Sequence, residues 1–315
     1  MKMTAKFHLP GLRYNYPLNM MLLSLKEKYP HYFQDNIEIA SFFGKFPTSL
    51  WNGGRFSNGD QCDRRFVEEV VKSINTRGIP VRYTYTNPLL TEEDLADAYC
   101  NFCMKTADNG KNEVLVVSPI LEAYIRKNYP GFTINSSTCK EIRGIEGVNE
   151  ELKKDYGLVV LDYNLNNQFG ELQKITDKSR CELLVNACCI PECPRRGEHY
   201  RTIAKQQRIT LKNRRHPADK QIPVPGWHCE YGNCNTIYDI QEYKTFISAE
   251  DIWEKYLPMG FCNFKIEGRT ADYFNLIDTY CYYLMEPKYR DEARLLLLMN
   301  LERSRVIVAL RAKRN

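Results

Sequence analysis

The order of hydrophobic and polar positions along the chain predicts eight short strands separated by helices. The candidate strands are rich in Val, Ile, Phe, Tyr and Thr, as strands buried on one or both faces should be. They span Ala5–Leu9, Ile37–Phe43, Val81–Thr86, Glu113–Val117, Phe132–Ser136, Gly157–Leu161, Cys181–Val185 and Phe261–Glu267.

The stretches between the strands carry helix signals. Apolar residues recur at helical spacing from Phe66 to Ile74. Thr91 and Asp94 form a capping-box pattern, and Ser118 places a cap residue before a proline. Beyond the last strand, two closing helices are expected over Ala271–Met285 and Tyr289–Arg311.

Eight strands alternating with helices are typical of an α/β fold, here a (β/α)8 barrel of the TIM type. An open, doubly wound sheet is the alternative, although no glycine-rich dinucleotide fingerprint follows the first strand. We expect one barrel over residues 1–315. A cysteine-rich insertion occupies residues 187–260, between the seventh and eighth strands, and the closing helices occupy residues 271–315.

Two long loops interrupt the alternation, and long loops in compact domains are usually functional or disordered. Gly44–Asp60 contains Arg55, and the insertion contains a basic run: Lys205, Arg208, Lys212, Arg214, Arg215 and Lys220. This run is either a solvated helix face or a surface that receives a phosphate backbone. The candidate substrate-binding residues are Ser118, Arg55, Arg214 and Arg215.

Composition narrows the class of protein. Hydrophobic residues make up 43% and charged residues 26% of the chain, as in globular domains. No apolar run approaches the roughly 18 residues of a membrane span, and the first ten residues lack the apolar core of a signal peptide. We therefore expect a cytoplasmic protein without membrane insertion. Its net charge of +5 does not by itself indicate a nucleic-acid partner.

Cysteines are unevenly distributed. Six of the twelve lie between Cys181 and Cys234, and in a cytoplasmic protein such clusters indicate metal ligands or reactive thiols. A CxxxC and a CxxxxC pattern predict four ligands: Cys189, Cys193, Cys229 and Cys234. Four thiolates suit a [4Fe–4S] cluster or a structural zinc ion. Cys188 or Cys181 is an alternative ligand, whereas the CxxC of Cys100 and Cys103 lies in a predicted helix and is expected in the core.

Candidate catalytic residues follow from the barrel, which places working groups at the carboxyl ends of its strands. These positions hold Asp162, Asn186 and, on the last strand, Glu267 and Arg269. Lys265, Glu267 and Arg269 share the face expected to point inward. A structural ion pair between Lys265 and Glu267 is the alternative to a catalytic role.

Three segments resemble the U-32 (collagenase-like) peptidase family. They are Phe264-Lys-Ile-Glu-Gly-Arg269, Leu184-Val-Asn-Ala-Cys-Cys-Ile-Pro-Glu-Cys-Pro-Arg195 followed by His199, and Ser118-Pro-Ile-Leu-Glu-Ala-Tyr-Ile-Arg126 followed by Tyr129-Pro130. The resemblance implies a barrel and, in several branches, a four-cysteine [4Fe–4S] cluster. Cys189 and Cys193 match family cysteines, whereas Cys229 and Cys234 rest on spacing alone.

The resemblance implies two different activities. One is oxygen-independent hydroxylation of an RNA base or a small aromatic ring, in which Arg269 would clamp a carboxylate and Glu267 with Lys265 would handle protons. The other is a peptidase, for which Cys189 with His199 is a candidate pair. A non-enzymatic scaffold with structural zinc is the third hypothesis. We expect an Fe–S enzyme acting on RNA or a small aromatic acid, and the sequence leaves a partner subunit open.

Overall fold

The eight predicted strands pair in chain order and close into a parallel barrel. The structure is a computed structural model that describes residues 3–54, 62–214, 216–231, 236–268 and 272–307. The first strand pairs with both the second and the eighth, so the sheet has no free edge. The expectation of a (β/α)8 barrel is confirmed, and the open-sheet alternative is wrong.

All eight strands lie inside or close to the predicted ranges. Their bounds are β1 Ala5–Pro10, β2 Ile37–Gly44, β3 Val81–Tyr85, β4 Glu113–Val116, β5 Thr133–Ser136, β6 Val159–Val160, β7 Cys181–Leu184 and β8 Asn263–Lys265. The β6 strand is the shortest, and its neighbour β5 contacts it through the single pair Ser136 and Val159. An irregularity in β1 between Phe7 and His8 shifts its register against β2.

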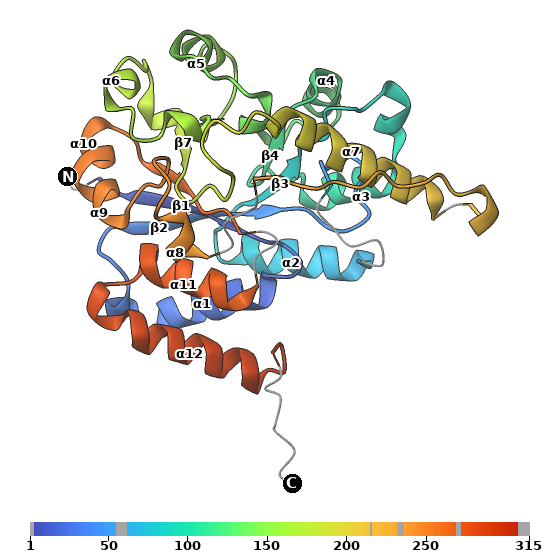
Figure 1. Cartoon of the computed structure of the whole chain (residues 1–315). Coiled ribbons are helices and arrows are strands. Elements are labelled where there is room, and N and C mark those ends of the chain that lie inside the picture. The colour runs from blue at the N-terminus through green and yellow to red at the C-terminus, as the bar shows by residue number, and fades with distance from the viewer. Residues whose placement is uncertain (1–2, 55–61, 215, 232–235, 269–271, 308–315) are drawn as a thin grey trace.

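The helices surround the barrel (Figure 1). Those between the strands are α1 Tyr16–Lys28, α2 Arg64–Thr76, α3 Ala98–Ala107, α4 Pro119–Asn128, α5 Ile145–Leu152, α6 Phe169–Leu172, α7 Arg196–Asn213, α8 Ile237–Ile240, α9 Ala249–Asp251 and α10 Leu257–Met259; α11 Tyr273–Leu284 and α12 Arg290–Arg303 follow β8. A π-helical segment, Ile252–Tyr256, joins α9 to α10. The α12 helix packs against both α1 and α11.

Two helix predictions differ from the structure in their bounds. The capping box at Thr91 and Asp94 is present, but it opens only a short 3-10 segment. The helix proper, α3, begins at Ala98, because Asp97 caps it by accepting the backbone N–H groups of residues 99 and 100. The last helix ends at Arg303 and not at Arg311, and residues 308–315 lie outside the described part of the chain.

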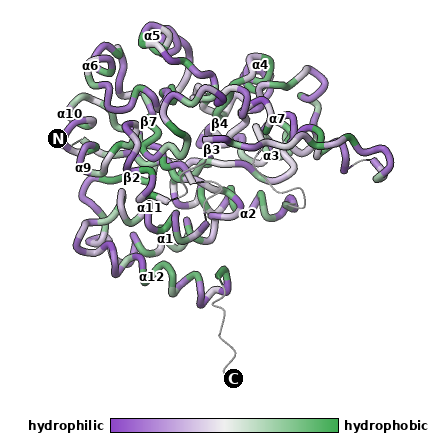
Figure 2. The backbone as a smooth tube through the Cα atoms, viewed as in Figure 1, coloured by the Kyte–Doolittle hydropathy of each residue, from purple (hydrophilic) through white to green (hydrophobic). Residues whose placement is uncertain are grey.

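The core lies between the outward face of the barrel and the inward faces of the helices. Alternation along the strands sends Phe7, Val81 and Leu183 outward, where each is fully buried against helices such as α2. Figure 2 shows hydrophobic residues concentrated in this layer, while hydrophilic residues predominate in the segment beyond α7. The cysteines of the CxxC pattern, Cys100 and Cys103, are fully buried in this core, as predicted.

The helix α7, within the cysteine-rich insertion, lies across one side of the carboxyl rim of the barrel. Near its start, Arg196 donates to Thr138 in the loop after β5. Near its end, Gln207 donates to Ser49 in the loop after β2, and Arg208 pairs with Asp94 after β3. Beyond these contacts α7 extends past the barrel (Figure 1). Within the described ranges, no helix has the length and apolarity that crossing a bilayer would require.

Candidate functional site at the carboxyl rim

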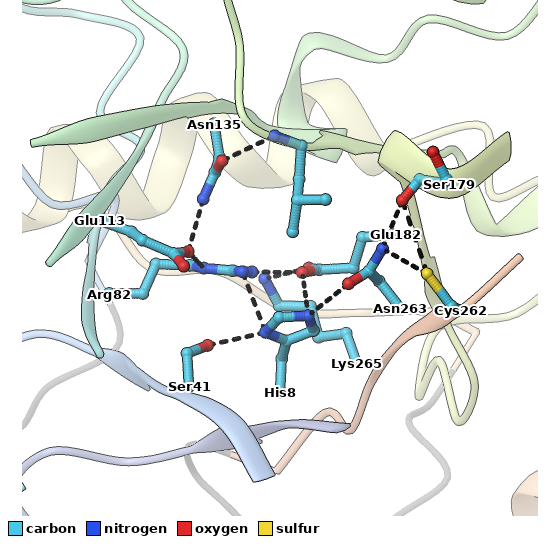
Figure 3. Close-up of polar contacts among 11 residues, drawn as sticks. His8, Ser41, Arg82, Glu113, Asn135, Ser179, Glu182, Cys262, Asn263 and Lys265 are labelled. Atoms are coloured by element: carbon cyan, nitrogen blue, oxygen red, sulfur yellow. Dashed lines mark hydrogen bonds and ion pairs between the residues drawn. The ribbon is translucent and has the colours of Figure 1, made fainter. Parts of the chain in front are cut away.

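A cluster of charged side chains fills the middle of the barrel (Figure 3). Arg82 of β3 lies at its centre and is fully buried. Its guanidinium donates to Glu113 of β4 at 2.5 Å and forms a second, very short ion pair with Glu182 of β7. Lys265 of β8 lies 3.2 Å from the other oxygen of Glu182. Two cations and two carboxylates therefore balance, as buried charges must.

His8 of β1 completes this cluster as a neutral ring. Arg82 can only donate, so its 2.9 Å hydrogen bond makes Nδ1 of His8 an acceptor. The proton then resides on Nε2, which faces Asn263 and Glu182, both at 3.4 Å. Burial and the nearby Arg82 lower the pKa of His8 to about 4. A neutral imidazole preserves the charge balance of the cluster at neutral pH.

Lys265 connects this cluster to the rim. Burial alone would raise the pKa of Glu182, but Arg82 and Lys265 hold it well below its usual range, so the carboxylate stays charged. The Lys265 ammonium also lies 4.2 Å from the ring centre of Phe43. The structure thus gives Lys265 an ion-pair partner, Glu182, that was not predicted from the sequence.

At the rim, Asn186 and Glu267 join the ends of β7 and β8. The Asn186 carboxamide donates to the backbone oxygen of Glu267 at 3.1 Å and accepts its backbone N–H at 2.7 Å. The Glu267 carboxylate accepts the backbone N–H of Cys188 at 3.0 Å. Asn186 therefore continues the pairing of the two strands through its side chain, and this places Glu267 against the cysteine loop.

The first cysteine pair lies directly beside this carboxylate. Cys189 interacts with the thiol of Cys193, the hydroxyl of Tyr163 and the charge of Glu267. Burial raises the pKa of the Cys189 thiol to about 11. The free thiol is therefore protonated at neutral pH, and any metal that bound it would have to displace a proton.

The second cysteine segment packs against the start of α7. Arg195, two residues after Cys193, donates to the backbone oxygen of His228 at 3.4 Å and pairs with Glu230 at 2.7 Å. Its guanidinium also lies 4.4 Å from the ring centre of Trp227. Cys229 lies between His228 and Glu230 in this segment, 36 residues after Cys193 in the chain.

The described residues do not assemble a complete metal site. Within the described ranges, no three His, Cys, Asp or Glu side chains are gathered closely enough to hold a metal ion. Cys189, Cys193 and Cys229 therefore do not converge as three ligands among these residues. The fourth expected ligand, Cys234, lies outside the described residues. The four-cysteine set stays a prediction.

The remaining candidates occupy different surroundings. The Asp162 carboxylate, at the end of β6, forms a buried ion pair with Arg196 at 2.7 Å. Ser118 caps α4 by accepting the backbone N–H of Leu121. Arg214 is exposed at the far end of α7, and three further candidates lie outside the described residues: Arg55, Arg215 and Arg269.

The charged core of the barrel was not among the features predicted from the sequence. Its residues, His8, Arg82, Glu113 and Glu182, lie in or begin strands that were predicted correctly. One pattern in the sequence could have indicated them: a single charged residue within a buried strand, at a position whose side chain points into the barrel. Arg82 in Val81-Arg-Tyr-Thr-Tyr85 is an example. Lys45, which directly follows β2 and is only 5% exposed, was also missed.

The protein is therefore a (β/α)8 barrel in which the loop that holds Cys188 and Cys189 contacts Glu267, just after the last strand. No protein-family model matches the chain, and no curated protein sequence does. Among solved structures, that of a U32 peptidase, Mk0906, is similar with a TM-score of 0.47 and 14% identity, covering 85% of this chain and 94% of that one. The assignment of the barrel rests on the closed sheet of this chain itself.

Proposed function

We propose that this barrel is an enzyme that holds an Fe–S cluster at its carboxyl rim and hydroxylates an RNA base or a small aromatic acid. The oxygen atom would come from an organic oxygen donor, which is reduced in the step, and not from molecular oxygen. The contact between the Glu267 carboxylate and the backbone N–H of Cys188 carries the proposal. It brings an acid–base group and a pair of thiols to the face where (β/α)8 enzymes work.

Thiols are the type of ligand that an Fe–S cluster requires. Cys189 and Cys193 would hold one side of it, and Cys229 and Cys234 would hold the other, with Arg195 keeping the second segment against the first. When bound, the cluster would supply redox chemistry at the rim. Cys229 has to move toward the first pair, because the described thiols do not converge on one point.

The chain's own residues would perform the acid–base and positioning steps. Asn186 orients Glu267, whose carboxylate exchanges a proton with the substrate. Lys265, fixed by Glu182, supplies a positive charge near the rim. Arg269 follows Gly268 in sequence and is proposed to clamp a carboxylate of the substrate or oxygen donor.

The peptidase alternative has less support from the site. A cysteine nucleophile needs a thiolate, and burial instead raises the pKa of the Cys189 thiol to about 11. The other candidate partner, His199, stacks in parallel on Trp227 with ring centres 4.8 Å apart. The zinc-scaffold alternative uses the same thiols and is distinguished by metal content.

One preparation tests all three hypotheses. The protein is purified without oxygen, and its visible spectrum, iron, sulfide and zinc are measured. The proposal expects a brown protein with about four iron atoms per chain, lost in Cys193→Ala but retained in Cys62→Ala, which alters a thiol outside the cluster segments. Stoichiometric zinc would support the scaffold instead. Metal-free protein that cleaves peptides would support the peptidase.

A further inference from the structure

The two closing helices present large apolar side chains to solvent. In α12, Leu295 is 57% exposed and Met299 is 38% exposed, and in α11 Phe274 is 58% exposed. The inner side of α12 packs against α1 and α11, which lie between it and the barrel (Figure 1). The exposed residues therefore lie on the side of α12 that faces away from the barrel.

These side chains form one continuous surface, the apolar strip. Arg294 of α12 pairs with Asp278 of α11 at 2.5 Å, and the short connection 285–289 returns the chain along α11. Phe274 lies one turn before Asp278, and Leu298 lies one turn after Arg294, so the two apolar residues lie on the same side of the helix pair. Leu298 is half-buried and adjoins Met299. The apolar strip thus runs from α11 onto the outer face of α12.

Charged residues stand at both ends of the apolar part of α12. Asp291, Leu295, Met299 and Arg303 follow one another at intervals of four residues, which places them in one ridge along the helix, and all four are exposed. The Asp291 side chain is 96% exposed and accepts from Arg294 through one carboxylate oxygen. An ionised carboxylate accepts several hydrogen bonds, so this contact leaves room for a further donor. Along the ridge the order is acid, apolar, apolar, base.

A ridge of this kind is complementary to itself when it is reversed. In the commonest class of helix packing, the ridges formed by every fourth residue lie side by side. Two antiparallel copies of α12 would then place Leu295 of one copy against Met299 of the second copy, and Asp291 against Arg303. A two-fold axis repeats both contacts, as in the interface of a symmetric dimer. Parallel copies would instead bring like charges together.

We propose that α12 is a self-association surface through which two copies of this chain form an antiparallel, two-fold symmetric dimer. Leu295 and Met299 form the centre of the interface, and Phe274 of each copy extends its apolar area. The opposite charges of Asp291 and Arg303 fix the direction of pairing, because complementary charges determine register more than affinity. The association is weak, since the apolar strip is small beside the interfaces of permanent dimers. This inference does not depend on the proposed function.

Sedimentation velocity of the whole purified protein tests the proposal. The unaltered protein should change from monomer to dimer between about 1 and 100 μM. Leu295→Asp should weaken association at least about tenfold, because it places a charge in the centre of the interface. The matched control is Ile222→Asp, at a 53% exposed apolar position beyond α7, which should leave association within about twofold. Unaltered protein that stays monomeric, or Leu295→Asp protein that associates equally well, would overturn the proposal.

Reversal of the charges tests the antiparallel arrangement. Asp291→Arg and Arg303→Asp should each weaken the dimer several-fold, because like charges then face each other, and the double variant should restore it. Both substitutions oppose the helix dipole, so damage to α12 itself would make the double variant worse than either single one. A double variant that associates more weakly than both single variants overturns the proposal. Near-UV circular dichroism checks folding, and Met299→Asp replaces Leu295→Asp, with the same expected and contradicting results, if the latter does not fold.

Discussion

The carboxylate of Asp162 and the guanidinium of Arg196 form a 2.7 Å ion pair in which both side chains are at most 2% exposed. Asp162 lies two residues after β6, and Arg196 begins the helix that follows the Cys189–Cys193 loop. The rings of Tyr163 and Tyr200 flank the guanidinium at 4.4 and 5.5 Å. This pair therefore fastens the cysteine-rich insertion to the barrel at one point.

The first prediction concerns that pair. Asp162→Asn should lower the free energy of unfolding by about 3 kcal/mol, because it leaves a buried guanidinium without its counter-charge. Urea denaturation gives this value directly. The matched control is Glu150→Gln, which breaks an exposed ion pair with Lys153 and should change little. Equal effects of the two substitutions would show that Asp162 does not anchor the insertion.

The second prediction concerns the pH dependence of stability. The pKa of His8 is about 4 in the folded protein and 6.5 as its ordinary value. Below pH 6.5 the unfolded chain binds a proton at His8 that the folded protein does not bind. The free energy of unfolding should therefore fall as the pH drops toward 4, by about 3 kcal/mol in all. Above pH 6.5 His8 should contribute no slope.

Unfolding free energies between about pH 7.5 and 4.5 measure this effect. His8→Gln should flatten the profile in that window, whereas His216→Gln, at an exposed position, should preserve it. Glu182, whose pKa is lowered, contributes only at more acidic pH, so the two groups are separable. An unchanged slope in His8→Gln would contradict the neutral, buried state of this ring.

The third prediction concerns the acid–base group at the rim. Glu267→Gln should reduce turnover by about 10²-fold or more while iron content stays unchanged, because only the proton-accepting group is lost. Asn186→Ala should also lower turnover, since it removes both hydrogen bonds that orient Glu267. Arg269→Ala should raise the KM for a carboxylate substrate.

Glu254→Gln, at an exposed position in the π-helical segment Ile252–Tyr256, serves as the control and should retain full turnover. Iron analysis accompanies each assay. Loss of the cluster in Glu267→Gln would assign this carboxylate a structural role, because the variant would then lack the metal centre as well as the proton acceptor.

The fourth prediction concerns the close approach of α7 to the rim. Gly54→Ala should destabilise the protein by about 3 kcal/mol, through both its left-handed backbone and the clash with the Ile203 carbonyl. Gly78→Ala shares the positive φ but has open space around the position, so it should cost only about 1 kcal/mol. Thermal unfolding compares the two. Equal losses of stability in the two variants would mean that α7 moves away from the added methyl group at no cost in free energy.

Much of the architecture was predictable because it depends on local patterns. Val67, Val70 and Val71 recur at helical spacing and do line the buried face of α2. The strand segment at Val81 reads as β structure from its own residues, and Ser118 caps α4 because a serine followed by proline favours a helix start. These preferences act over a few neighbouring residues.

The candidate site was predictable only in part. The ends of β7 and β8 pointed to Asn186 and Glu267, and the structure joins them. Asp162 was predicted as a site residue because it follows a strand. Its partner Arg196 was not predicted, because the two residues meet only when α7 lies across the rim. Lys45 was missed because its burial and its hydrogen bond to Asn52 depend on how the loop after β2 folds, which no local pattern specifies.

The sequence alone determined where each strand and most helices form, and which side chains alternate inward, because these properties depend on backbone preferences and on the spacing of apolar residues. Tertiary structure decided which charges meet. Arg82 and Glu182 are 100 residues apart and become partners only when the sheet closes into a barrel, so that the inward side chains of β3 and β7 meet across its interior. Electrostatic pairing depends on distance through space, and no local pattern specifies that distance.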